Sequence, residues 1–166
     1  MKVKIGGYPD YQYWLDRLFG WNPKQKISVR IDDHDTWSMD YTLAHIILPM
    51  LVQLKATKHS SPMVDMEDVP KELRATKKQL TAYSKTGETD YKFFKRWDWV
   101  LDEMIWAFEQ KCRDNWDEDF YEYADDDTER FGVKLVWEDR EGSKAHQERM
   151  SNGFRLFGKY YENLWD

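Results

Sequence analysis

Apolar residues recur every three or four positions between Thr36 and Thr57, which is the spacing of one face of an α-helix. The positions on this face are Met39, Leu43, Ile46, Ile47, Met50 and Leu54. The opposite face is also mostly apolar, with Tyr41, His45, Leu48 and Val52. A helix that is apolar on every side is typical of the middle of a protein. We therefore predict a buried central helix here, with a kink at Pro49 because proline lacks an amide donor.

Two further helices and several short strands are predicted from the same kind of pattern. The range 93–113 has one apolar stripe, formed by Phe94, Trp97, Leu101, Met104, Ile105, Phe108 and Cys112. The range 143–164 has another, formed by His146, Met150, Gly153, Phe157, Tyr161 and Leu164, where the glycine permits close approach of a second helix. Ranges 2–5, 26–31 and 131–137 are predicted strands, and 11–19 a short helix.

Two stretches interrupt these elements. Residues 58–91 are highly charged and only weakly periodic, so we predict a mobile arm or lid with a helix from Asp68 to about Tyr83. Residues 114–129 are predicted to be an acidic connecting segment. The predicted fold is a single domain of residues 1–166. It is mainly α, a compact helical bundle around the buried central helix, with a small two- to three-stranded β element.

The composition narrows the class of protein. Apolar residues make up 41% of the chain and aromatic residues 16%, which indicates a packed core rather than general disorder. The single Cys112 excludes an intramolecular disulfide and a multi-cysteine metal site. The longest apolar stretch, 44–54, is shorter than the roughly 20 residues that cross a bilayer, and the first residues lack a secretory signal. We therefore expect a soluble protein of a reducing compartment, without a membrane partner.

The net charge of −6 is concentrated in one place. Nine Asp and Glu residues lie between Asp114 and Glu129, where there is no Lys or Arg. Because phosphate binding needs concentrated Lys and Arg, we expect no duplex nucleic acid partner. The segment is interpreted as a solvated linker, with an acidic docking strip for a basic partner as the alternative.

Four carboxylates are candidates for a metal site. Helical spacing places Asp98, Asp102 and Glu109 along one border of the second helix's buried stripe, and Asp40 borders an apolar face of the first helix. If the two helices pack side by side, the four converge into a site for Mg²⁺ or Mn²⁺ and a substrate phosphate, and they become the candidate catalytic residues. The Glu-x-x-Glu pairs of helical nucleotide pyrophosphatases are absent. The alternative, which base rates favour, is that these acids edge a solvated face.

Arg149 and His146 are candidate ligand-binding residues one turn apart on the last predicted helix. A partly buried Arg needs an anion, and a protein carboxylate is favoured over a ligand phosphate because acids are abundant here. Trp99 and Trp106 lie together on the back of the second helix. If they are exposed they mark a protein interface or a base-stacking surface, and if the arm covers them they are core.

Two other sets of residues have a structural interpretation that is favoured over a chemical one. The run from Asp32 to Asp35 is typical of a turn with helix caps, although it also has the residue types of a metal ligand or general base. We expect His45 to be a hydrogen-bonded core residue rather than a ligand. Cys112 lies on an apolar stripe, which argues against a nucleophilic thiol.

Several longer strings carry a resemblance to a known family. They are RIDDHDTWSMDYTLAHIILPMLVQLK, then EDVP, WVLDEMIWAFE and the ending LFGKYYENLWD. In these strings, which cover both strong helices and the C-terminus, the chain resembles a family of small proteins from tailed bacteriophages. The resemblance implies a phage gene product that acts in the bacterial cytoplasm. It implies no particular activity and no site residues.

Three functions are compatible with these features. The first is a non-catalytic binding protein that captures a host factor or a small anionic, nucleotide-like ligand, for instance in counter-defence. This protein could form a homo-oligomer. It needs no cofactor. The second is a metal-dependent nucleotide phosphohydrolase that uses the four carboxylates with Mg²⁺ or Mn²⁺. The third is a virion structural or assembly component. We rank them in this order.

Overall fold

The structure of the chain is a computed structural model that describes residues 2–5, 18, 27–125 and 132–165. Contacts divide the chain into two units, residues 1–42 and residues 43–166, and each unit is described by itself. The helix predicted over 11–19 lies outside the described residues apart from Leu18. Our expectation of one domain over 1–166 made no such division, and it stays a prediction.

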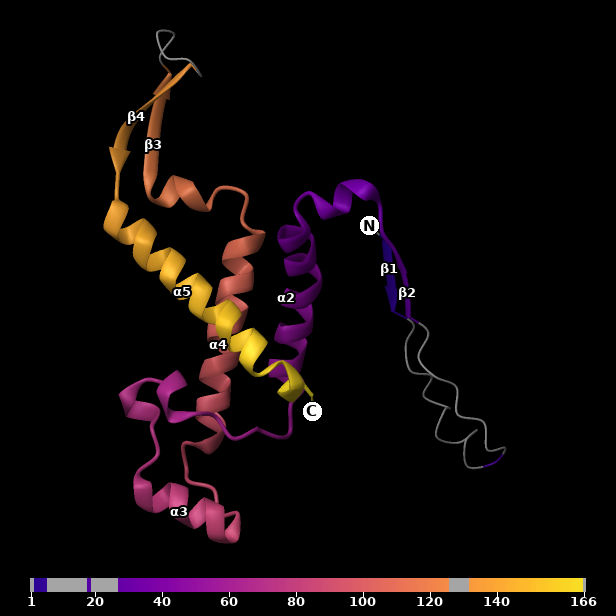
Figure 1. The fold of residues 1–166 in the computed structure, drawn as a ribbon, viewed down its shortest axis with the longest axis vertical. Coiled ribbons are helices and arrows are strands. Elements are labelled where there is room, and N and C mark those ends of the chain that lie inside the picture. Colours follow the sequence, from indigo (N-terminus) through magenta and orange to yellow (C-terminus); the bar gives the residue numbers. More distant parts are fainter. Residues whose placement is uncertain (1, 6–17, 19–26, 126–131, 166) are drawn as a thin grey trace. The chain divides into compact units, whose positions relative to one another are not determined.

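The first unit contains a β-hairpin and a short turn of helix. Strand β1 (Lys2–Ile5) pairs antiparallel with β2 (Ile27–Arg30), and both strands were predicted (Figure 1). A 3₁₀ turn follows at Asp33–Thr36. The Asp32 carboxylate accepts a hydrogen bond from the His34 amide at 3.1 Å, and the Asp35 carboxylate accepts one from the Asp32 amide at 2.7 Å. The structure therefore shows the turn and capping roles that were favoured for the acidic run.

Helix α2 (Met39–Thr57) confirms the helix predicted from the 36–57 pattern, but not its burial. Only Ala44 and Leu51 are buried along it, and Leu43 and Met50 are 40% and 58% exposed. The reason is that α2 packs into the core of the second unit along one side only, where Ile47, Leu48 and Leu54 lie beside the two buried residues. The prediction of a buried central helix at this position is wrong.

Helix α4 (Phe93–Cys112) is instead the most buried element of the second unit. Its buried apolar residues are Phe93, Trp97, Val100, Leu101, Met104, Ala107 and Phe108. Four of them, Trp97, Leu101, Met104 and Phe108, belong to the seven-residue predicted stripe, whereas Phe94 of that stripe is exposed. Arg96 and Glu103 are also buried, so this helix carries two charges into the core that need partners.

Helix α5 (Arg140–Lys159) packs against α4, and a short 3₁₀ turn at Tyr161–Asn163 follows it (Figure 1). The two helices approach most closely at Gly153. A Cβ atom added there would lie 2.4 Å from the Ala107 Cβ and 2.6 Å from the Glu103 carbonyl oxygen. The predicted role of Gly153 in close helix packing is confirmed, since no other residue fits without moving α4.

The segment 58–91 contains more irregular structure than predicted. It has 3₁₀ turns at Met66–Asp68 and Lys71–Leu73, then helix α3 (Lys77–Thr86), which ends at Gly87 with a φ of 72°. The single helix predicted from Asp68 to Tyr83 is therefore replaced by two turns and a later helix. Val64 and Val69 are buried in the core, so the first half of the segment is packed. Its role as a mobile arm or lid stays a prediction.

The acidic segment forms part of a second hairpin. Strand β3 (Tyr121–Asp125) pairs antiparallel with β4 (Val133–Glu138), with an irregularity in register between Glu122 and Tyr123. The prediction of a strand over 131–137 is confirmed within the described residues. The fold is mainly α with little β structure, as the pattern predicted, and the described strands form two separate two-stranded sheets rather than one β element. Among the described helices, none combines the length and the apolar character needed to cross a membrane.

Candidate functional site

The second unit contains an apolar groove between α2 and the C-terminal end of α5, here called the α2–α5 groove. Its volume is about 780 Å³. The lining residues are Ile47, Pro49, Met50, Leu51, Gln53, Leu54, Thr57, Phe157, Tyr161 and Leu164. The α2 wall includes Ile47, Met50 and Leu54 of the apolar face recognised in the sequence, and the other wall is the last part of the predicted 143–164 stripe. A volume of this size falls within the roughly 300–1,000 Å³ of typical binding sites.

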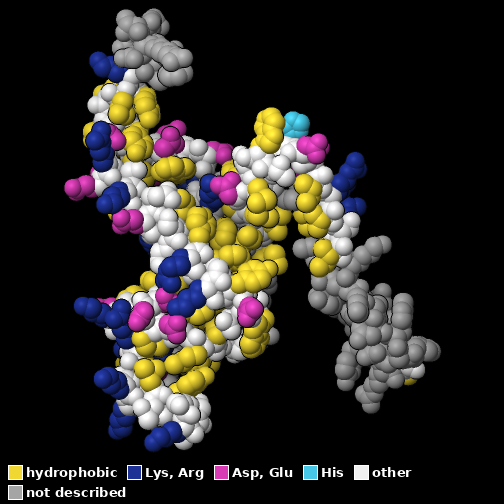
Figure 2. Space-filling model, viewed as in Figure 1, with side chains coloured by type: hydrophobic (Ala, Val, Ile, Leu, Met, Phe, Trp, Pro, Cys, Tyr) yellow, Lys and Arg dark blue, Asp and Glu magenta, His cyan; other side chains and the backbone are white. Residues whose placement is uncertain are grey.

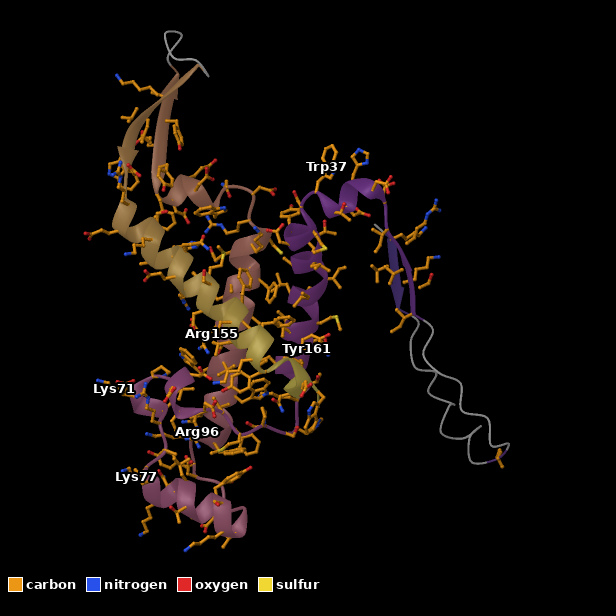
Figure 3. All side chains as sticks on the ribbon, viewed as in Figure 1. Trp37, Lys71, Lys77, Arg96, Arg155 and Tyr161 are labelled. Atoms are coloured by element: carbon orange, nitrogen blue, oxygen red, sulfur yellow. The ribbon has the colours of Figure 1, made fainter. Side chains whose placement is uncertain are left out.

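The rim of the α2–α5 groove exposes large apolar side chains. Met50 is 58% exposed on α2, and Tyr161 is 65% exposed after the end of α5. Figure 2 shows hydrophobic side chains at the surface over α2 and the end of α5, and Figure 3 shows Tyr161 beside this helix. Contiguous exposed apolar surface is unfavourable for an isolated soluble protein and marks an interaction site.

The four candidate metal ligands do not form a metal site in the described part of the chain. No group of three or more His, Cys, Asp or Glu side chains there is placed to hold an ion. Asp98 instead pairs with the Lys58 ammonium at 2.5 Å, and Asp102 pairs with Lys55. Glu109 is exposed on α4, and Asp40 belongs to the first unit. Asp98 and Asp102 do lie on the same side of α4, as predicted. There they form ion pairs with Lys58, which follows the end of α2, and with Lys55 of α2.

Arg149 is held by a protein carboxylate, which is the alternative that the sequence favoured. Its guanidinium donates two hydrogen bonds to Glu103, at 3.0 and 2.8 Å, and this interaction raises the pKa of Arg149. The guanidinium carbon also lies 3.9 Å from the centre of the Trp106 ring. Glu103, one of the buried charges of α4, is thereby neutralised. The pair crosses the α4–α5 contact next to Gly153 and fixes it.

His146 lies in an aromatic cluster rather than at an open binding site. Its ring stacks parallel to Trp116 at 5.6 Å and lies edge-on to Trp106 at 5.1 Å, and Phe120 is also in contact. Its Nε2 is 3.1 Å from the Gln110 side-chain oxygen, and its buried Nδ1 has no partner among the described residues. Burial lowers the pKa of His146, and the nearby Arg113 and Arg149 add to this. The ring is therefore held in its neutral form at neutral pH.

The two tryptophans of α4 are not a continuous exposed surface. Trp99 is partly buried against the core, and Trp106 is covered by Arg149 and His146. Their interpretation as an open interface or base-stacking surface is not supported by these contacts. The expectation that His45 is a core residue is wrong, because its side chain is exposed on α2, where the chain packs only along one side of the helix. Its Nδ1 lies 3.7 Å from the Sγ of the half-buried Cys112, and burial raises the pKa of that thiol.

A buried carboxylate that the sequence analysis did not single out organises the packed half of segment 58–91. Asp68 accepts hydrogen bonds from Arg155 at 2.7 Å, Lys159 at 2.6 Å and the Tyr160 hydroxyl at 2.7 Å. Burial and the bond to Asp68 raise the pKa of Tyr160 to about 12. The spacing of Arg155 and Lys159 at i and i+4 was a visible signal, because it places two cations on one helix face.

We compared the chain with known proteins. No family model, no curated protein and no solved structure matches it. The resemblance to small proteins of tailed bacteriophages therefore stays a prediction, and the argument about function rests on the geometry of the described residues.

Proposed function

We propose that the chain is a non-catalytic binding protein that captures a partner protein. An amphipathic helix of the partner lies in the α2–α5 groove. The observation that carries this proposal is the groove itself, an open hollow of about 780 Å³ with apolar walls and exposed apolar side chains at its rim. Removing such a surface from water lowers the free energy, so binding of an apolar partner is favourable.

The walls of the groove favour a helical occupant over an extended one. A strand binds by adding to the edge of a sheet, but no sheet lines this groove: one wall is α2, and the other is the end of α5 with the 3₁₀ turn and Leu164 after it. An α-helix satisfies its own backbone and presents only side chains. The α2 wall extends from Ile47 to Thr57, about 15 Å or three helical turns. No charged side chain is among its ten lining residues, so the occupant's buried face is apolar.

The phage resemblance supplies the biological setting of the proposal. A small protein made in an infected bacterium acts among host proteins in the cytoplasm, so the partner is proposed to be a host protein, as in counter-defence. Capture needs no cofactor. The small anionic ligand is not assigned to Arg149, because Glu103 already occupies its guanidinium.

The enzyme alternative has lost the arrangement on which it depended. A metal-dependent phosphohydrolase needs carboxylates that are free to bind a cation, whereas Lys58 and Lys55 neutralise Asp98 and Asp102. No described residue favours a virion component over a capture protein. We therefore propose neither of these two functions.

The proposal is tested with a fluorescein-labelled 14-residue amphipathic peptide that has leucines on one helical face. We expect saturable binding in fluorescence anisotropy, and we expect Met50→Asp to weaken it at least tenfold by placing a charge at the groove rim. Val52→Asp is the matched control, since Val52 is 47% exposed on the same helix but does not line the groove. It should change the affinity less than twofold.

Three results would contradict capture in this groove. They are no saturable binding of the peptide, equal weakening by both variants, and equal binding of a peptide of the same composition with its leucines scattered around the helix. Sedimentation of the free protein is the companion measurement. A dimer that Met50→Asp dissociates would show that the occupant is a second copy of this chain instead.

A further inference from the structure

A second surface of unit 43–166 has the opposite character, because it is rich in lysine. Between Lys71 and Lys95 there are seven Lys and Arg residues and three Asp and Glu residues. Within the described chain, none of the six lysines of this stretch forms an ion pair, and among their ammonium groups only that of Lys92 donates a hydrogen bond, to the Glu72 carbonyl. The other five are Lys71, Lys77, Lys78, Lys85 and Lys95. Figure 2 shows Lys and Arg side chains around α3, and Figure 3 shows Lys71 and Lys77 extending away from the ribbon. We call α3 and these lysines the α3 basic surface.

The acids of this stretch do not cancel the positive charge. Asp90 is fully engaged, because Arg96 donates two hydrogen bonds to its carboxylate and a third to the Leu73 carbonyl. The first turn of α3 holds Lys77 and Lys78 and no acid, where helices usually place Asp or Glu. The dipole of α3 therefore adds to the charge of these lysines, and this end of the helix attracts anions.

A cleft with an exposed aromatic ring lies within the α3 basic surface. Its volume is about 490 Å³. It lies between α3 and the loop after it, and its lining residues are Thr76, Lys78, Gln79, Ala82, Glu88, Thr89, Asp90 and Tyr91. Tyr91 is 76% exposed, with the Lys92 ammonium 5.3 Å from its ring centre. An exposed ring beside lysines is the combination that holds a base and its phosphate.

We propose that the α3 basic surface binds single-stranded nucleic acid, with a base stacked on Tyr91 and the phosphates held by Lys78 and neighbouring lysines. Stacking on an exposed ring requires an unpaired base, which excludes the interior of a duplex. Lys77 and Lys85 are about 12 Å apart along α3, which is farther than one phosphate group reaches. A strand therefore uses the surface better than a free nucleotide. Glu88 repels phosphate, so the backbone runs on the lysine side of the cleft.

The experiment is fluorescence anisotropy of a labelled 12-residue oligothymidine titrated with the full-length protein at low salt. The expected result is saturable binding that weakens as salt rises. Replacing Lys77, Lys78 and Lys85 together by Gln should weaken it at least tenfold, and should reduce the salt slope by about 2, since each phosphate contact on a single strand contributes about 0.7. Tyr91→Ala should weaken binding about fivefold or more.

Matched controls separate this surface from general charge and from misfolding. Lys144→Gln removes an exposed lysine of α5, and Tyr123→Ala removes an exposed tyrosine of β3, and each should change the affinity less than twofold. Circular dichroism checks that each variant is folded. Three outcomes would overturn the proposal: no binding at low salt, equal affinity for a poly-glutamate peptide of the same length, and equal affinity for thymidine monophosphate. The last two would indicate an acidic protein and a free nucleotide.

Discussion

Asp68 is the residue whose loss should be felt most widely, because three groups of α5 and its end converge on it. Burial raises the pKa of Asp68, but the hydrogen bonds from Lys159, Tyr160 and Arg155 outweigh burial and leave it below the ordinary value. We expect Asp68→Asn to lower the free energy of unfolding at neutral pH by about 1–3 kcal/mol, less than a fully buried pair because both cations are partly exposed.

The pH dependence of Asp68→Asn gives the sharper test. A carboxylate with a lowered native pKa stabilises the fold above its unfolded pKa of about 3.9, and this contribution is lost as the pH falls through the native pKa. Urea unfolding should therefore show a gap between wild type and Asp68→Asn at pH 7 that closes in acid. Asp65→Asn, which removes a more exposed partner of Lys159, should cost under about 1 kcal/mol. A gap that is constant with pH would contradict this account.

His146 should also make the stability fall in acid, but at a higher pH than Asp68 does. Its pKa is lowered chiefly by burial, so the folded protein resists protonating a ring that the unfolded chain protonates near pH 6.5. Stability should be full above this pH, and should fall as the pH drops from 6.5 to the native pKa. Urea unfolding at intervals from pH 7.5 to 5 measures the slope. His146→Gln should flatten it, and equal slopes in the wild type and this variant would contradict the explanation.

At the scale of elements, the periodicity of the sequence predicted where the helices are but not which of them is buried. Helix α4 carries the charged residues Arg96 and Glu103 among its apolar ones, yet it is the buried helix. It can be buried because Arg96 pairs with Asp90 and Glu103 pairs with Arg149. The 36–57 pattern is more apolar, yet α2 is half open. Burial depends on which elements pack against a helix, and long-range ion pairs such as Arg149–Glu103 have no signature in local spacing.

The two faces of α2 should respond differently to truncation. Leu51→Ala removes a buried side chain from the core and should cost about 2–5 kcal/mol. Leu43→Ala removes a side chain that is already 40% exposed, and should cost under about 1 kcal/mol. Chemical denaturation of both variants measures the difference. Similar large losses would restore the wholly buried helix that the sequence pattern predicted.

At the scale of the whole molecule, the candidate sites were harder to predict than the fold. The helical border of Asp98 and Asp102 was read correctly from spacing, but spacing does not show that lysines 55 and 58 would lie opposite. The α2–α5 groove combines two stripes that were both recognised, from α2 and from the end of α5. The groove was missed because each stripe was assigned to the core. A sequence pattern identifies the apolar face of a helix, but it does not show whether another element packs on that face or leaves a groove there.

The division of the chain into two units makes a last prediction about the whole molecule. Every residue of the buried core in the described part of the chain lies within residues 43–166, as do the ion pairs that stabilise this core, so this unit should fold by itself. A fragment of residues 37–166, which keeps all of α2, should unfold cooperatively with a melting temperature within about 5 °C of the full chain, as expected for a free-energy change of about 1 kcal/mol. It should also bind both the amphipathic peptide and the oligothymidine. Thermal unfolding followed by circular dichroism is the measurement. A fragment that is unfolded at room temperature would show that the first 36 residues belong to the same cooperative unit.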